Sequence, residues 1–222
     1  MLVYSLGTVP YADTLDLQRR LHAARARGET PDTLLLLEHP PTYTIGRQGD
    51  GSHLLVPESE LRRLGAELHW VDRGGDVTFH GPGQIVGYPI LYLGSPWPDL
   101  PAYLRKLESV LIDAVGELGA PARVIPGFTG VWAGREKLAS LGAKVTRGVT
   151  MHGFALNVNV DLSWFDLIHP CGLVRRKATS LSRLFGKDVD MEIVGRLLAE
   201  RLGKAFGGRP EWATETARLA AF

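Results

Sequence analysis

RGGDVTFHGPGQ, the stretch at residues 73–84, places four glycines between two apolar segments that are predicted to be strands, residues 67–72 and 84–93. Glycine lets a backbone turn sharply or lie directly against a ligand. We therefore expect main chain to converge here, together with the side chains of Arg73 and His80, on a small molecule. The alternative is a tight hairpin whose glycines serve only positive-φ geometry, and composition alone does not separate the two.

The segments around this stretch predict strands interspersed with a few helices. Residues 33–38 form a continuous apolar run that ends at Pro40 and Pro41, which is typical of a buried central strand. Residues 99–118 carry apolar side chains at three- and four-residue spacing and predict the clearest helix. Further strands are predicted at 2–6, 42–47, 123–125, 130–133, 137–147 and 151–160, further helices at 11–27, 57–64 and 190–206, a helical turn at 162–168, and a marginal helix from 211. No linker or repeat divides the chain, so we expect one α+β domain over residues 1–222, with mixed sheets flanked by helices.

Bulk properties exclude several classes of partner. The 222 residues carry a formal net charge of +1, with no run of like charge, so nucleic acid is not expected. No apolar stretch approaches the ~20 residues that span a bilayer, and the N-terminus lacks a signal-peptide pattern. The single cysteine cannot close an intrachain disulfide, which favours a cytoplasmic protein without a structural zinc site.

Cys171 is the first candidate for chemistry. A lone cysteine is most often a small buried hydrophobe, but Pro170 and Gly172 on either side predict a loop that displays the thiol. Its thiolate would need a positive neighbour, for which Lys137, Arg73, His80 and His169 are candidates. His169 is so close in sequence that we expect it to support the loop rather than react. Lys137 taken alone would be read as a surface lysine.

Cofactor motifs are missing. The sequence has no G-x-x-x-x-G-K-[ST] phosphate loop, no G-x-S-x-G elbow and no H-E-x-x-H helix, and its histidines have no metal-ligand spacing. We therefore expect no metal and no nucleotide cofactor. The basic residues 175–177 and 62–63 are most simply solvated, although a basic rim near Cys171 would suit an acidic protein partner.

Five blocks in this order resemble the octanoyltransferases, also called lipoyl(octanoyl) transferases. They are RGGDVTFHGPGQ at 73–84, KLASLG at 137–142, HGFALN at 152–157, PCG at 170–172 and TSL at 179–181. The similarity runs from about residue 34 to 184, and Phe79 departs from it where many relatives have tyrosine. The resemblance implies the α+β core shared with biotin and lipoate ligases.

The same resemblance implies an activity and a site. An octanoyl group would pass from octanoyl-acyl carrier protein to Cys171 as a thioester, and then to a lysine of the lipoyl domains of 2-oxoacid dehydrogenases or the glycine cleavage H protein, without a cofactor. Lys137 would activate Cys171, either as ammonium or as a base. Apart from the resemblance, we expect a monomer. The implied walls of the acyl site are Arg73, Gly74, Gly75, Asp76, Val77, Thr78, Phe79, His80, Ser140, Leu141, Gly142, Gly153, Phe154 and Ala155.

Physical reasoning adds two expectations to that site. Val77, Leu141, Phe154 and Leu156 are expected to line an apolar slot, in which each buried methylene contributes about 0.8 kcal/mol. Backbone N–H groups near Gly75 and Gly172 are candidate donors to an oxyanion. The alternatives are an ATP-dependent lipoate or biotin ligase, a non-catalytic protein that binds acyl groups or lipoyl domains, and, less favoured, a papain-like thiol hydrolase.

Overall fold

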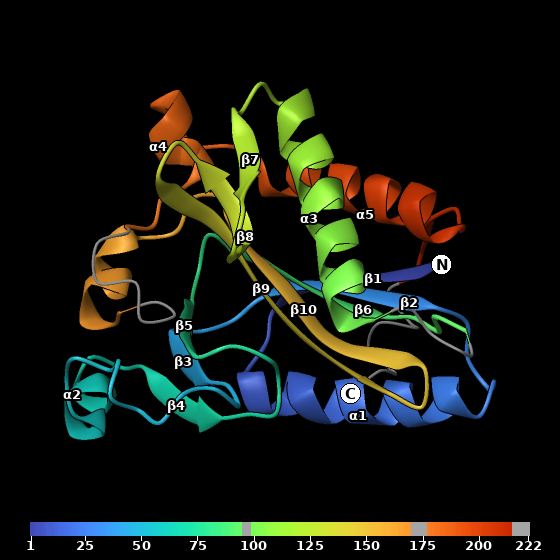
Figure 1. Cartoon of the computed structure of the whole chain (residues 1–222), viewed down its shortest axis with the longest axis horizontal. Coiled ribbons are helices and arrows are strands. Elements are labelled where there is room, and N and C mark those ends of the chain that lie inside the picture. Colours follow the sequence, from blue (N-terminus) through green and yellow to red (C-terminus); the bar gives the residue numbers. More distant parts are fainter. Residues whose placement is uncertain (95–98, 170–176, 215–222) are drawn as a thin grey trace.

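A computed structural model describes residues 1–94, 99–169 and 177–214 of the chain. Its larger sheet has the strand order β11-β1-β2-β6-β10-β9-β8-β7 (Figure 1). β2 pairs with β1 in parallel and with β6 antiparallel, and all pairs from β6 to β7 are antiparallel. The bounds are β1 Leu2–Thr8, β2 Thr33–Glu38, β6 Gln84–Ile90, β7 Ala122–Ile125, β8 Phe128–Ala133, β9 Glu136–Thr146, β10 Val149–Asn157 and β11 Glu211–Trp212.

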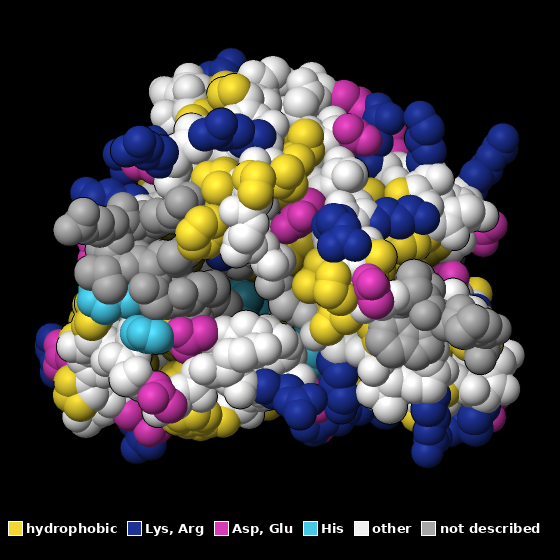
Figure 2. Space-filling model, in the orientation of Figure 1, with side chains coloured by type: hydrophobic (Ala, Val, Ile, Leu, Met, Phe, Trp, Pro, Cys, Tyr) yellow, Lys and Arg dark blue, Asp and Glu magenta, His cyan; other side chains and the backbone are white. Residues whose placement is uncertain are grey.

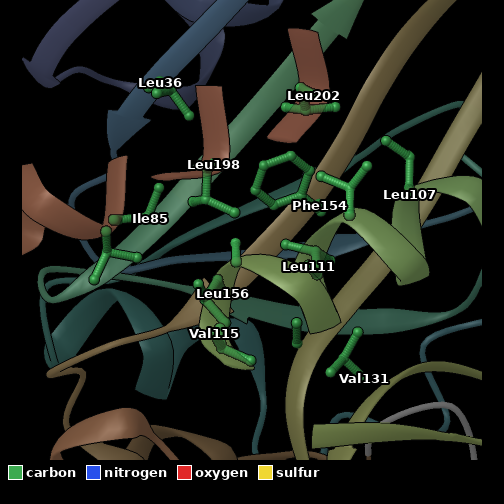
Figure 3. Packing of buried hydrophobic residues seen from close by; sticks show 14 of the residues in the cluster. Leu36, Ile85, Leu107, Leu111, Val115, Val131, Phe154, Leu156, Leu198 and Leu202 are labelled. Carbon is green, nitrogen blue, oxygen red and sulfur yellow. The ribbon is translucent and has the colours of Figure 1, made fainter. Parts of the chain in front are cut away.

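Helices cover both faces of this sheet. On one face lie α3 (Leu100–Glu117) and α5 (Met191–Phe206), and on the other lies α1 (Tyr11–Ala26) (Figure 1). The core on the α3 and α5 face contains the ring of Phe154, which packs with Leu111 of α3 and with Leu198 and Leu202 of α5 (Figure 3). The opposite face is closed by Leu17 of α1, which packs with Leu35 and other side chains of the sheet. β2 is therefore buried on both sides, as its continuous apolar run predicts.

A smaller sheet of order β4-β3-β5 stands beside the larger one. Its strands are β3 (Thr42–Ile45), β4 (Glu67–Trp70) and β5 (Val77–His80), and its helical neighbours are α2 (Glu58–Arg63) and the 3-10 helix η1 (Leu162–Leu167). An aromatic core holds them together, because Phe79 stacks on Trp164 at 5.2 Å between ring centroids and also meets Tyr43 and Phe165. One short helix, α4 (Leu181–Phe185), follows in the chain.

Three segments differ from the sequence predictions. Residues 77–80 form strand β5, which pairs with β3, where only a glycine-rich turn was expected. The tail from Glu211 is predicted as a marginal helix, but its first residues form β11, because Leu2 and Val3 of β1 offer them a parallel partner; the rest of that prediction, from residue 215, lies outside the described residues. The short α4 was not predicted. By contrast, the α+β class and the helices α1, α2, α3 and α5 are confirmed. In the part of the chain described here, no helix is long and apolar enough to cross a membrane.

Candidate active site

A narrow cavity lies where β5, β6, β9, β10 and the start of α1 meet. Its enclosed free volume is about 40 Å³ in this structure. Main chain and side chains contribute to the lining, which is partly apolar and partly polar. The lining residues are Tyr11, Arg73, Gly75, Val77, Thr78, His80, Val86, Tyr88, Lys137, Ser140, Leu141, Gly142, His152, Gly153, Phe154 and Ala155.

Lys137 is the second residue of β9 and is buried against the cavity, with 8% of its surface exposed. Its Nζ lies 5.3 Å from the centroid of the Trp132 ring, a distance at which the ring attracts a cation. Gly130 makes room for the side chain: a Cβ at Gly130, whose φ is +137°, would stand 2.6 Å from Cε of Lys137. The interpretation of Lys137 as a solvated surface lysine is therefore wrong.

Cys171 lies outside the described residues, but the residues that flank its segment are anchored. His169 N donates to the carbonyl of His53 at 2.8 Å. On the other side, Lys137 N donates to Lys177 O at 2.8 Å, and Thr179 N donates to Lys137 O at 2.9 Å. The segment that carries Cys171 thus runs between a contact with His53 and a contact with Lys137 itself.

Most of the predicted wall residues line the cavity, and three do not. Gly74 packs its backbone on β9, where its N–H donates to Ala143 O at 3.1 Å. Phe79 is fully buried in the aromatic core of the small sheet. Asp76 turns its carboxylate to His53, with 2.5 Å between Oδ2 and Nδ1. Leu156, expected in the apolar slot, lies instead in the core between the large sheet and α3.

Arg73 and His80 do converge on the cavity, as expected from the glycine-rich stretch. The Arg73 guanidinium also organises the backbone there: Nη2 donates to the carbonyls of Thr44 and Asp76, each at 2.7 Å. His80 is bonded through Nδ1 to Gln84 Oε1 at 2.9 Å, and burial holds the pKa of its imidazole well below the usual range. Neutral His80 is therefore a poor source of positive charge for a thiolate.

His152 is a polar wall residue with a strained backbone. Its φ is +58°, in the left-handed region, although it lies within strand β10. Nε2 donates to Asp72 Oδ1 at 2.7 Å, and Asp72 also accepts from Lys144 Nζ at 2.6 Å. The hydrogen bond from His152 is the main reason why the pKa of Asp72 is lowered, whereas burial lowers the pKa of His152. Nδ1 of His152 has no hydrogen-bond partner among the described residues.

Four lining residues were missed as wall residues by the sequence analysis: Tyr11, Val86, Tyr88 and His152. Burial raises the pKa of Tyr11 to about 12, so its hydroxyl stays protonated. His152 could have been predicted as a wall residue, because it directly precedes the predicted wall residues 153–155. No feature of the sequence around Tyr11 marks it as a cavity residue. It reaches the cavity only because α1 packs on the sheet in the folded protein.

Of the two glycines near which oxyanion donors are expected, only Gly75 lies among the described residues. The N–H of Gly75 donates to the side-chain oxygen of Gln48. Gly172 lies outside the described residues. The Gly75 N–H itself is thus already engaged by a side chain, and the expectation of an oxyanion donor near Gly75 or Gly172 stays a prediction.

A wider cavity lies elsewhere, between α5 and the β1–β2 part of the sheet. It has a volume of about 550 Å³ and is lined by Leu36, Ile85, Met191, Trp212 and neighbouring residues. None of the predicted site residues lies on it. The candidate site is therefore the narrow cavity, which brings together residues from the five elements α1, β5, β6, β9 and β10.

The fold and the cavity define the class of the protein, a catalytic domain of the lipoate-ligase type. A crystal structure of lipoate-protein ligase A bound with ATP superposes with a TM-score of 0.76 at 17% identity, covering 100% of this chain and 93% of that one. Residues 10–203 match the family described as Lipoyl protein ligase A/B catalytic domain.

Sequence comparison narrows the class. A protein named octanoyltransferase from Rubrobacter xylanophilus is 50% identical over 203 residues, which cover 90% of this chain and 91% of that protein. Another octanoyltransferase, from Caldicellulosiruptor saccharolyticus, is 47% identical over 206 residues, 92% of this chain and 88% of that protein. The chain thus belongs to the octanoyltransferases of the lipoyl protein ligase A/B family.

Proposed function

We propose that this protein is an acyltransferase that moves an octanoyl group from octanoyl-acyl carrier protein, through a thioester on Cys171, to a lysine of a lipoyl domain. The observation that carries the proposal is that Lys177 and Thr179, which follow Cys171 in the chain, hydrogen-bond to the backbone of Lys137 at the wall of a cavity that has an apolar side. The names of the relatives agree with octanoyl transfer. Lipoyl domains of 2-oxoacid dehydrogenases and the glycine cleavage H protein are the proposed acceptors.

In the first half-reaction the Cys171 thiolate attacks the carrier thioester, a new thioester forms and the carrier thiolate leaves. Lys137, as ammonium, would stabilise the attacking thiolate through its charge. Thioester exchange is nearly balanced, so this step needs no nucleotide. Val77, Leu141 and Phe154 supply the apolar side of the cavity against which the acyl chain would pack.

In the second half-reaction a lysine amine attacks the acyl-enzyme, the Cys171 thiolate leaves and an amide forms. Amide formation from a thioester is downhill, which drives the overall transfer. A buried polar wall of Arg73, Tyr11 and His152 lines the same cavity. Chain-length selection would follow from how far the walls can open around the acyl chain.

Intact mass spectrometry tests the proposal. Wild type and Cys171→Ala are mixed briefly with octanoyl-acyl carrier protein, and hydroxylamine is added afterwards. We expect an octanoyl adduct that hydroxylamine removes, on wild type alone. An adduct on Cys171→Ala, or full transfer to a lipoyl domain by that variant, would contradict the covalent route. Labelling of a lipoyl domain only with octanoate and ATP would identify a ligase instead, and binding without turnover would leave a non-catalytic protein.

A further inference from the structure

The hairpin of β9 and β10 forms one long wall of the narrow cavity (Figure 1). Lys137 lies near the start of β9, whereas His152 of β10 pairs with Ala143, six residues beyond Lys137 along β9. Both Lys137 and His152 line the cavity. On the face shown in Figure 2, histidine side chains are visible deep between the small sheet and the strands of the large sheet. The cavity therefore extends from Lys137 to His152.

The distance between these two ends matches the length of an octanoyl chain. A Cβ at Gly130 would stand 3.5 Å from Nζ of Lys137 and 2.9 Å from Ala139 O, so the ammonium lies close to Ala139. Ala143 follows Ala139 by four residues, which is about 13 Å at the rise of a strand. An octanoyl chain extends about 9 Å from its carbonyl carbon to its methyl group, and van der Waals contact at the end adds about 4 Å. A chain whose carbonyl lies beside Nζ of Lys137 thus ends next to His152.

The lining of the cavity changes from apolar to polar along this path. In the middle, Ala155 of β10 and Val86 of β6 are cross-strand partners with small apolar side chains. At the far end, a Cβ at Gly142 would stand 3.1 Å from Cδ of Arg73, so the Arg73 side chain crosses β9 near the level of His152. An acyl chain therefore meets apolar side chains first and polar ones at its methyl end.

His152 is held in place at this end by its backbone and by its ring. Its N–H donates to Gln18 Oε1 of α1 at 2.9 Å, and Nε2 donates to Asp72 Oδ1 at 2.7 Å. Asp72 is itself fixed by Lys144, whose Nζ donates to it at 2.6 Å. The φ of His152, +58°, is a strained conformation that persists only where the surroundings impose it. The ring therefore cannot swing aside to lengthen the cavity without breaking these bonds.

The remaining nitrogen makes the ring a polar end wall. Nδ1 of His152 is buried and has no hydrogen-bond partner among the described residues. The ring is neutral because burial lowers its pKa, and its proton is on Nε2, so Nδ1 is an acceptor. A buried acceptor needs a water molecule or another donor, and a methylene group supplies no hydrogen for such a bond. An acyl chain that pressed further into this end would leave Nδ1 unsatisfied.

We propose that His152 is the specificity-determining residue that limits the acyl chain to the length of an octanoyl group by closing the end of the cavity. This inference rests on the proposed function, because the role of Lys137 fixes where the acyl carbonyl lies. His152 takes no part in the bond changes and acts only by excluding further methylenes. Arg73 at the same end is less suited to this role, because its Nη2 donates to the carbonyls of Thr44 and Asp76 and so holds the backbone together.

The chain-length profile of transfer tests the assignment. Hexanoyl-, octanoyl-, decanoyl- and dodecanoyl-acyl carrier protein are offered to wild type, His152→Gly and His152→Asn, and kcat/KM for transfer to a lipoyl domain is measured with each donor. Glycine and asparagine both tolerate the left-handed backbone at this position. The matched control is Arg147→Gly. Arg147 is the other non-glycine residue with a positive φ, +53°, among the described residues, and it is exposed in the turn between β9 and β10.

We expect wild type to use dodecanoyl about tenfold less well than octanoyl, or worse, because the longer chain would bury the unsatisfied Nδ1. His152→Gly should raise the ratio of kcat/KM for dodecanoyl to that for octanoyl about tenfold or more, since further methylenes can be buried where the ring stood. His152→Asn should raise this ratio less, because its amide is polar and fills part of the space. Arg147→Gly should keep the wild-type ratio. Thermal melting verifies that each variant is folded.

A dodecanoyl-to-octanoyl ratio that stays at the wild-type value in both His152 variants would overturn the role of His152. So would an equal rise of this ratio in Arg147→Gly, or a wild type that uses dodecanoyl as well as octanoyl. Failure of wild type to form an acyl-enzyme with any of these donors would instead refute the proposed function, so the two failures are distinguishable.

Discussion

Gly87→Ala should destabilise the protein through a single, identifiable collision. Gly87 on β6 is the cross-strand partner of Phe154 on β10, and the Phe154 ring lies directly over its Cα. A Cβ at position 87 would stand 2.5 Å from Cε1 and 2.8 Å from Cε2 of that ring, and closer still to Cζ. The ring is 3% exposed and packed between α3 and α5, so it has no free space to move into on that side (Figure 3).

Overpacking of this kind costs about 1–3 kcal/mol. For a chain of this size, the melting temperature falls by roughly 2–4 °C for each kcal/mol, so a decrease of about 2–12 °C is expected. Because Phe154 also lines the narrow cavity, the displaced ring should slow acyl loading as well.

Calorimetry of a double-mutant cycle separates the collision from other effects. Gly87→Ala combined with Phe154→Leu should be less destabilised than the sum of the single variants, by about 1 kcal/mol or more. The matched control is Gly116→Ala in α3, where a Cβ meets nothing within 4 Å and the helix should tolerate or gain from alanine. A Gly87→Ala variant that melts as wild type, or strictly additive effects in the cycle, would refute the reasoning.

Two further predictions concern charge. Lys137→Ala should move the alkylation rate of the Cys171 thiol to higher pH, since a positive neighbour would be lost, whereas Lys137→Arg should keep it; unchanged profiles in both would count against the ammonium role. Burial lowers the pKa of His39 from 6.5 to about 4 in the folded protein, where Nδ1 donates to Val9 O and Nε2 accepts from the Tyr88 hydroxyl. As the pH falls, His39 is therefore protonated in the unfolded chain before it is protonated in the folded protein, which favours the unfolded chain. The difference in free energy of unfolding between wild type and His39→Gln should shrink by about 3 kcal/mol from pH 7 to pH 4. A free-energy difference that stays constant over this pH range in urea unfolding would contradict the prediction.

Helices were the part of the fold that the sequence predicted best, because their signals are local. The spacing of Leu107, Leu111 and Val115 in α3 predicts its buried face, and Asp99 caps the helix by accepting from Ala102 N at 2.6 Å. Asp190 does the same for α5 through the N–H groups of Glu192 and Ile193. Each of these features lies within a few residues, so tertiary context was not needed to recognise it.

The end of the chain shows the opposite case. Residues from 211 onward have no strand pattern of their own, and β11 exists because the backbone of Met1 and Val3 supplies partners: Glu211 N donates to Met1 O and Ala213 N donates to Val3 O. Contacts that join residues about 210 positions apart leave no trace in local composition. The strand β5 was missed for a related reason. The glycines around it predict a turn, whereas its pairing with β3, which the local sequence does not reveal, makes residues 77–80 a strand.

The motif blocks indicated the family of this protein and the residue types that the proposed chemistry would use: a cysteine, a lysine and a glycine-rich wall. Only the tertiary structure decided which way each side chain points. Thr78 and His80 line the cavity, Phe79 between them enters an aromatic core, and Asp76 turns to His53. The physical reason is that side chains alternate between the faces of a strand, and the pairing of distant strands decides which face meets the cavity and which meets the core.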